Sequence, residues 1–323
     1  MGGPFFVLPP SMRLTRITFV LLGLFWGSNF IYMKWATEFI SPMQVAFLRV
    51  LFGFVPLAIA AWHKRAIARS QLRLLPHFLV MAVGATAFYF TAIIKGTAVL
   101  PSGIAGVLGG AIALFAAIFS FLFLRTEKLN ALMAAGVVLG FAGIVLIARP
   151  WESGNSHIDL TGMCWVLASS IVLGLSYIYV RIFLSPSNLP PLALATWQMG
   201  LALLVLGALT DFTGIGHILQ NWRATAGVVI GLGILGTGVA FLIYYYLLQE
   251  LGAVASSGSN YMAPAVALLI GWAVGERFGL LEFAAIVLTF AGITLLQIGQ
   301  QRASGTLAST PGIVCSSLAD AEE

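Results

Sequence analysis

The stretch "WGSNFIYMKW" at residues 26–35 places polar side chains at the end of the first long apolar run of the chain. A related stretch, "LGLSYIYVRI", occurs at residues 173–182 and has the same Gly, Ile and Tyr, with Ser176 at the position of Asn29. Each stretch also carries one basic residue near its end. The two stretches therefore read as copies of one element, and they predict that the chain is built from a duplicated unit.

The composition indicates whether this duplicated unit folds in water or in a lipid bilayer. Of the 323 residues 60% are hydrophobic and only 8% are charged, which is too apolar for a soluble domain with a single core. The charges are confined to short connections, and the runs between them have the length that a helix needs to cross a bilayer. Strict alternation of polar and apolar residues is absent, which argues against a β-barrel. We expect an all-α integral membrane protein.

Ten apolar runs qualify as membrane-spanning helices. The expected spans are residues 16–34, 44–62, 77–95, 102–124, 130–149, 161–183, 191–211, 224–249, 254–275 and 281–300. An even number of spans places both ends of the chain on one side of the membrane. Lys and Arg are concentrated on the side of the chain ends, most strongly in the first half, so the positive-inside rule predicts cytoplasmic termini. We expect the location to be a bacterial inner membrane.

A second pair of similar segments fixes the register of the duplication. Glu127 and Glu276 are each followed by a basic residue and then, at the same distance, by "FAGI". Each half then contains five spans, and because five is odd the second copy must enter the membrane from the opposite side. The sequence thus predicts ten transmembrane helices arranged as two inverted five-helix repeats, an organisation that permits alternating access to a site at the membrane midplane.

The expected organisation has five parts. They are an N-terminal cytoplasmic segment (1–15), the first repeat (16–149), a periplasmic linker (150–160), the second repeat (161–300) and a disordered cytoplasmic tail (301–323). The first apolar run follows Arg13 and Arg16 and lacks a small-residue cleavage site, so we predict no removable signal peptide.

Enzyme chemistry has little support in the sequence. Cys164 and Cys315 give neither a disulfide framework nor metal-ligand spacing. Phosphate-binding loops, zinc-binding HExxH motifs, nucleophile elbows and paired intramembrane Asp residues are not found. We therefore expect no catalytic residue, no metal and no cofactor, and the net charge of +5 reflects membrane topology rather than nucleic-acid binding.

Arg49 is the main candidate for contact with a substrate, because a charge inside a span usually faces protein or water. It can reach the membrane surface, form a structural ion pair, or bind a substrate carboxylate. Asn29 shares a helix face with Trp26 and Met33, and it serves either as a polar contact between helices or as part of a cavity wall.

Further candidates are polar or aromatic residues at matching depths in other spans. The expected cavity residues are Trp26, Asn29, Arg49, Tyr89, Trp165, Ser176, Tyr177, Asn260 and Tyr261, with Pro264 as a gating residue. Proline removes a backbone donor, so we expect the ninth span to bend beside its polar start "ASSGSNYMAP". Trp62 and the run "YYY" at residues 244–246 are expected in interfacial aromatic belts. Glu276 is expected to form a local charge-balanced turn.

The chain resembles the EamA-type branch of the drug/metabolite transporter superfamily. The resemblance rests on the ten spans in two halves, on "WGSNF" in the first span, on "FLRVLFG" in the second and on "YMAPAVALL" in the ninth. Within this branch the chain is similar to bacterial exporters of the YddG type, which are associated with aromatic amino acids. The resemblance implies a secondary transporter in the lipid bilayer whose small-molecule substrate is an amino acid. Drug or nucleotide-sugar carriage is the alternative, and the oligomeric state is open, with a monomer compatible.

Overall fold

The computed structural model describes residues 10–124, 130–148 and 159–308, and within these residues all regular structure is helical. The helices are α1 (Pro10–Thr37), α2 (Pro42–His63), η1 (Arg69–Leu74), α3 (Leu75–Met81), η2 (Ala82–Phe88), α4 (Tyr89–Val99), α5 (Ser102–Gly109), α6 (Ala111–Phe123), α7 (Ala131–Ala148), α8 (Leu160–Tyr179), η3 (Val180–Leu184), η4 (Ser185–Ser187), α9 (Pro191–Leu209), η5 (Ile215–Gln220), α10 (Trp222–Ala226), η6 (Gly227–Val239), α11 (Ala240–Ala273) and α12 (Leu280–Ala308). The expected linker and both terminal segments lie partly outside the described residues.

The membrane-spanning helices confirm the prediction of an all-α, ten-helix membrane protein. Among the described residues, nine helical stretches are long and apolar enough to cross a bilayer, and one shorter apolar helix accompanies them. The nine are Leu14–Thr37, Pro42–His63, Arg69–Val99, Ser102–Phe123, Ala131–Ala148, Leu160–Ser187, Pro191–Leu209, Trp222–Glu250 and Leu280–Arg302, and the shorter helix is Met262–Ala273. Several spans consist of two or more consecutive helical elements, which is why their ends differ from those expected.

Polar residues at the helix starts explain where the spans begin. The Ser41 side chain accepts a hydrogen bond from the Gln44 N–H, and the Gln44 side chain accepts one from the Ser41 N–H, with Pro42 in the first turn. This reciprocal capping satisfies backbone donors that the helix itself leaves open. Asp159 and Asn221 cap α8 and α10 in a similar way.

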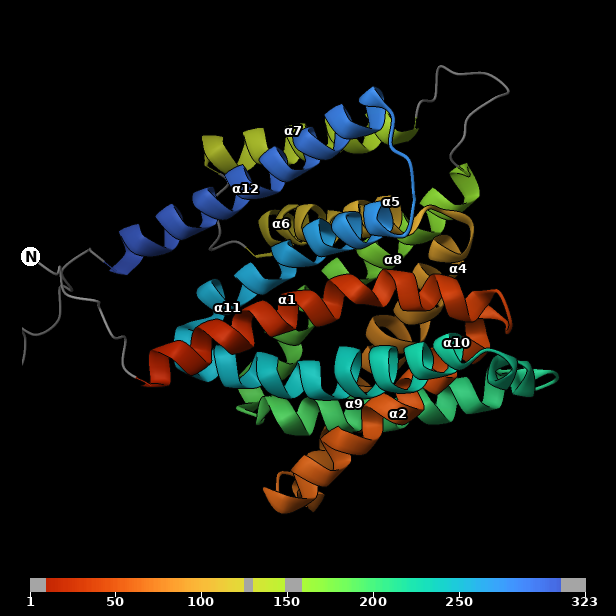
Figure 1. The fold of residues 1–323 in the computed structure, drawn as a ribbon. Coiled ribbons are helices and arrows are strands. Elements are labelled where there is room, and N and C mark those ends of the chain that lie inside the picture. The colour runs from red at the N-terminus through yellow and green to blue at the C-terminus, as the bar shows by residue number, and fades with distance from the viewer. Residues whose placement is uncertain (1–9, 125–129, 149–158, 309–323) are drawn as a thin grey trace, which may run out of the picture.

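The packing of the helices is matched between the two halves of the chain (Figure 1). α1 packs against α11 as α6 packs against α8, and α2 packs against η6 as α9 packs against η2. α7 and α12, the fifth and last spans, lie side by side at one edge of the molecule, while α2 lies at the opposite edge. Each contact maps onto its partner when the first and second five spans are exchanged, which supports the prediction of two related halves.

Small residues allow the helices to approach closely. Between α7 and α12, a side chain added at Gly136 would meet the Gly292 carbonyl oxygen at 2.6 Å. In η6, one added at Gly233 would collide with Phe52 of α2. Such contacts supply van der Waals packing where lipid removes the hydrophobic driving force between helices.

Three spans contain π-helical segments that a regular helical pattern did not predict. η2 lies in the third span, η3 in the sixth and η6 in the eighth. A π-helical turn widens the helix and is frequent at functional sites. η2 and η6 occupy equivalent positions in the two halves, and each contributes a residue to the wall of a central cavity, Ala85 and Gly236.

The two ends of α11 belong to different spans. Residues of its first part and of η6 contact α1 in antiparallel order, because Tyr246 lies near Thr15 while Gly236 lies near Asn29. Its last part runs parallel to α1, with Met262 beside Gly23. The described apolar part of the ninth span is Met262–Ala273, which lies within the expected span 254–275.

Candidate functional site

A cavity of about 400 Å³ lies between helices from both halves of the chain. It is lined by Trp26, Asn29, Phe30, Met33, Arg49, Met81, Ala85, Tyr89, Phe90, Ile93, Gly106, Gly109, Gly110, Ile112, Ala113, Ala116, Leu173, Tyr177, Gln198, Gly236, Phe241, Tyr244, Ala263, Pro264 and Gln300. This volume falls within the range of about 300–1,000 Å³ that small-molecule sites occupy. The wall is mainly apolar and aromatic, and it contains one charged side chain.

That charged side chain, Arg49, is buried, with 6% of its surface exposed. Its Nε donates to Thr237 Oγ1 at 3.0 Å, and its Nη1 lies 3.9 Å from Met33 Sδ. The guanidinium carbon lies 3.9 Å from the centroid of the Phe90 ring, a cation–π arrangement. These partners are neutral, and no carboxylate in the described part of the chain bonds to Arg49.

Asn29 connects Arg49 to α1. When its amide is oriented to satisfy both ends, a choice made from the hydrogen-bond network, Oδ1 accepts from Arg49 Nη2 at 3.2 Å and Nδ2 donates to the Phe25 carbonyl at 3.1 Å. Asn29 is buried, and a side chain added at Gly236 would collide with its amide. The close approach of α1 and η6 at Gly236 thus holds Asn29 against the guanidinium.

Arg49 is surrounded by neutral acceptors and an aromatic face, and among the described residues these acceptors do not take up every donor of its guanidinium. A guanidinium has five N–H donors in a planar fork that matches a carboxylate. The three contacts made by Nε, Nη1 and Nη2 do not use them all. Burying a charge without a counter-ion is unfavourable, so an anionic ligand in the cavity would stabilise the site.

Six of the predicted residues lie in the cavity wall and two lie elsewhere. The wall contains Trp26, Asn29, Arg49, Tyr89, Tyr177 and Pro264. Trp165 is not part of it, because its ring packs beneath Lys95 Nζ at 4.5 Å. Ser176 is buried and donates to the Val172 carbonyl at 2.7 Å, which satisfies its hydroxyl within α8. The side chains of Asn260 and Tyr261 lie outside the described residues.

The cavity also contains residues that the sequence did not single out. Phe90 stacks with Arg49, and Gln198, at the position equivalent to Arg49 in the second half, donates to Thr86 Oγ1 at 2.7 Å. Tyr244, expected in an interfacial belt, lies 5.7 Å from the Trp26 ring and lines the cavity. The sequence of three consecutive tyrosines does not indicate which of their rings faces the cavity.

Polar contacts bridge the helices one turn beyond the cavity wall, at the end where α1 finishes. Lys34 Nζ donates to the Leu100 carbonyl at 2.7 Å, next to the lining residue Met33. The Glu276 carboxylate accepts from the N–H groups of Ser102 and Gly103 at 2.6 and 2.9 Å. Glu276 therefore caps α5 rather than forming the expected local turn, because open amide donors at a helix start attract a carboxylate.

Comparison with known proteins agrees with this architecture. Residues 14–149 and 160–298 each match the EamA-like transporter family. An uncharacterized inner membrane transporter, YedA of Escherichia coli K12, is 25% identical over 86% of this chain and 89% of that protein. A protein named as a probable terminal-alkyne amino-acid exporter of Streptantibioticus cattleyicolor is 26% identical over 93% of this chain and 99% of that protein.

A solved crystal structure also shares the fold. It aligns with a TM-score of 0.57 over 90% of this chain and 99% of that chain, at 19% identity. The two family matches together cover most of the sequence, one in each half. The chain therefore belongs to the EamA-like transporter family and is a multi-pass membrane transporter rather than an enzyme.

Proposed function

We propose that this transporter exports amino acids with aromatic or large apolar side chains by alternating access around the central cavity. The observation that carries the proposal is Arg49, a buried cation with neutral partners in an aromatic cavity. The guanidinium binds the substrate carboxylate through a two-pronged hydrogen bond. The apolar side chain of the substrate packs against the aromatic wall.

The ammonium group of the substrate faces neutral side chains in the cavity wall. The lining residues of the cavity include no Asp or Glu, but they include the side-chain oxygens of Gln198 and Gln300 and the faces of Tyr89 and Tyr177. Aromatic faces attract cations, and more so away from water. The name of the Streptantibioticus relative, an amino-acid exporter, agrees with this substrate class.

The cavity argues against a nucleotide sugar or another phosphate-bearing substrate. Several phosphate charges favour several basic residues, and Arg49 is the one Lys or Arg among the lining residues. In this proposal the protein lies in a bacterial inner membrane with its termini in the cytoplasm. The lining residues include no carboxylate that could couple transport to protons. We therefore propose facilitated diffusion, in which the substrate gradient drives transport.

Transport by purified protein in proteoliposomes tests the proposal. Vesicles are loaded with labelled tryptophan, phenylalanine, alanine or a uridine diphosphate sugar, and efflux is followed with and without a pH gradient. We expect protein-dependent efflux of tryptophan and phenylalanine, weaker efflux of alanine, and none of the nucleotide sugar. Efflux no faster than from empty vesicles across the amino-acid panel would overturn the amino-acid assignment.

A further inference from the structure

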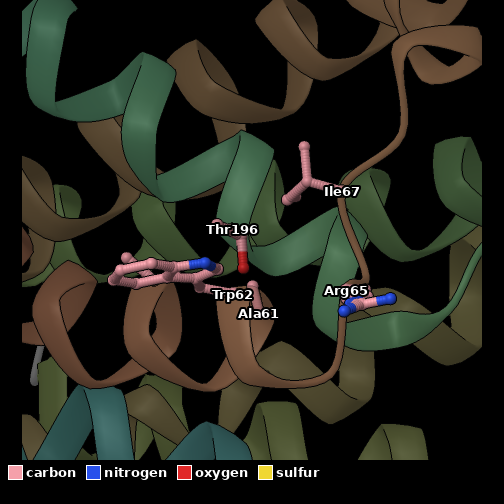
Figure 2. A pocket seen from close by; sticks show the side chains of 6 residues that line it. Ala61, Trp62, Arg65, Ile67 and Thr196 are labelled. Atoms are coloured by element: carbon pink, nitrogen blue, oxygen red, sulfur yellow. The ribbon is translucent and has the colours of Figure 1, made fainter.

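A second pocket, of about 500 Å³, opens at the end of α2 (Figure 2). It shares no lining residue with the central cavity. Its wall consists of Ala58, Ala61, Trp62, Arg65 and Ile67 together with Thr196 of α9. Figure 2 shows the Trp62 ring and the Arg65 side chain on either side of Thr196. The pocket thus combines an apolar floor, an exposed aromatic ring and an exposed guanidinium at the end of a membrane span.

The position of the pocket matches the boundary between headgroups and acyl chains. α2 ends at His63 and α9 begins at Pro191, so both bounding spans reach the membrane surface here. Thr196 lies roughly 8 Å along α9 from its start, at 1.5 Å per residue. Trp62 is 83% exposed, which suits an indole at the membrane interface. A ligand in the pocket would therefore contact both the apolar layer and the polar layer.

The backbone conformation at Arg65 indicates that the turn alone does not explain why this position carries an arginine. The N–H of Arg65 donates to the Trp62 carbonyl at 3.0 Å, and at the end of α11 the N–H of Gly275 donates to the Trp272 carbonyl at 3.0 Å. Both turns need a left-handed residue, with φ of 50° at Arg65 and 94° at Gly275. Glycine adopts this conformation without strain, whereas arginine does not. The guanidinium at this position therefore serves something other than the turn.

The two segments that form the pocket carry only positive charges. The connection from α2 to α3 carries Lys64, Arg65, Arg69 and Arg73, and the sequence has no Asp or Glu between Glu38 and Glu127. The second wall adds none, because the sequence between Asp159 and Asp211 also lacks acidic residues. An anion bound here would meet no repulsion from either of the two segments that form the pocket.

We propose that this pocket binds one anionic phospholipid from the bilayer. The phosphate lies against the Arg65 guanidinium. Thr196, whose hydroxyl donates to the Leu192 carbonyl at 2.7 Å, forms part of the pocket wall beside the glycerol region. One acyl chain follows the groove between Trp62 and Ile67 toward Ala58. Basic pockets at the membrane surface between helices favour anionic headgroups in this way. This site is independent of substrate transport through the central cavity.

Native mass spectrometry of the detergent-purified, full-length protein tests the proposal. The probes are phosphatidylglycerol, phosphatidylcholine and free glycerol 3-phosphate. We expect wild-type protein to retain one phosphatidylglycerol about fivefold more tightly than phosphatidylcholine. Arg65→Gly preserves the turn and removes the guanidinium, so it should bind both lipids equally while unfolding at no lower temperature. Arg65→Asn, which also tolerates the left-handed conformation, should behave in the same way.

Arg223→Ala is the matched control. Arg223 also neighbours an exposed tryptophan, Trp222, at the start of another span, but it does not line the pocket. It should keep the preference for phosphatidylglycerol. A preference that survives in Arg65→Gly, or is lost equally in Arg223→Ala, would overturn the proposal. Displacement of the lipid by an equal concentration of glycerol 3-phosphate would also overturn it, because the site would then be one for soluble phosphate compounds.

Discussion

Glu276 closes the start of α5 through Ser102, accepting a hydrogen bond from its N–H at 2.6 Å and another from its hydroxyl at 2.8 Å. The two residues belong to different halves of the chain. The contact joins the connection between α11 and α12 to the fourth span, one turn from the cavity residue Gly106. An ionised acceptor strengthens each of these bonds.

Replacing this carboxylate should weaken the folded protein. Glu276→Gln removes the charge at the helix start and should reduce stability by about 1–2 kcal/mol, seen as a lower unfolding temperature in detergent. Glu38→Gln is the control, since Glu38 is exposed. Equal unfolding temperatures for the two variants would show that the cap contributes nothing measurable.

A methyl group at Gly236, in the cavity wall, should disturb substrate binding by displacing Asn29. Gly236→Ala pushes the Asn29 amide away from Arg49 and should weaken substrate affinity about tenfold. Gly84→Ala is the matched control in the other π-helical segment, where the nearest atom, of Val172, lies at an ordinary 3.6 Å. Affinities measured by equilibrium binding should separate the two, and equal affinities would argue against the placement of Asn29.

The sequence predicted both Trp26 and Trp165 in the cavity, but the structure places only Trp26 there, so their substitutions should affect substrate affinity differently. Trp26→Ala removes an aromatic wall residue beside Tyr244 and should weaken binding of an aromatic substrate about two- to tenfold. Trp165→Ala removes a ring that packs against Lys95 outside the cavity, and should leave affinity within about twofold. If Trp165→Ala weakened affinity as much as Trp26→Ala, the assignment of Trp165 to helix packing would be wrong.

The sequence could identify Arg49 and Asn29 because polar groups are rare in apolar spans. Their environment could not be read from it, since Thr237 and Gly236 come from the eighth span. Helical periodicity gives the face on which Ser176 lies but not which neighbour that face meets. The cap that Glu276 forms on a distant helix depends on how the two halves pack. A short-range sequence pattern does not predict such a contact. The span count, by contrast, follows from the number and length of the apolar runs.

Pro264 remains predicted as a gating residue, and it is buried in the cavity wall within α11. A proline inside a helix removes one backbone hydrogen bond and loosens the segment. Pro264→Ala should leave the protein folded and inserted, with substrate affinity near wild type and a lower turnover number. Efflux per folded molecule equal to wild type would mean that the proline only fits the packing.

The role of Arg49 as the carboxylate anchor is the central claim, and competition binding against labelled phenylalanine tests it most directly. Unlabelled phenylalanine and phenylalaninamide differ only at the group that Arg49 binds. Wild-type protein should prefer the carboxylate by about 10- to 100-fold, as expected for a charge-assisted pair. Folded Arg49→Gln should bind both compounds with equal, weak affinity. Equal affinity of the wild type for the two compounds, or an unchanged preference in Arg49→Gln, would contradict the account.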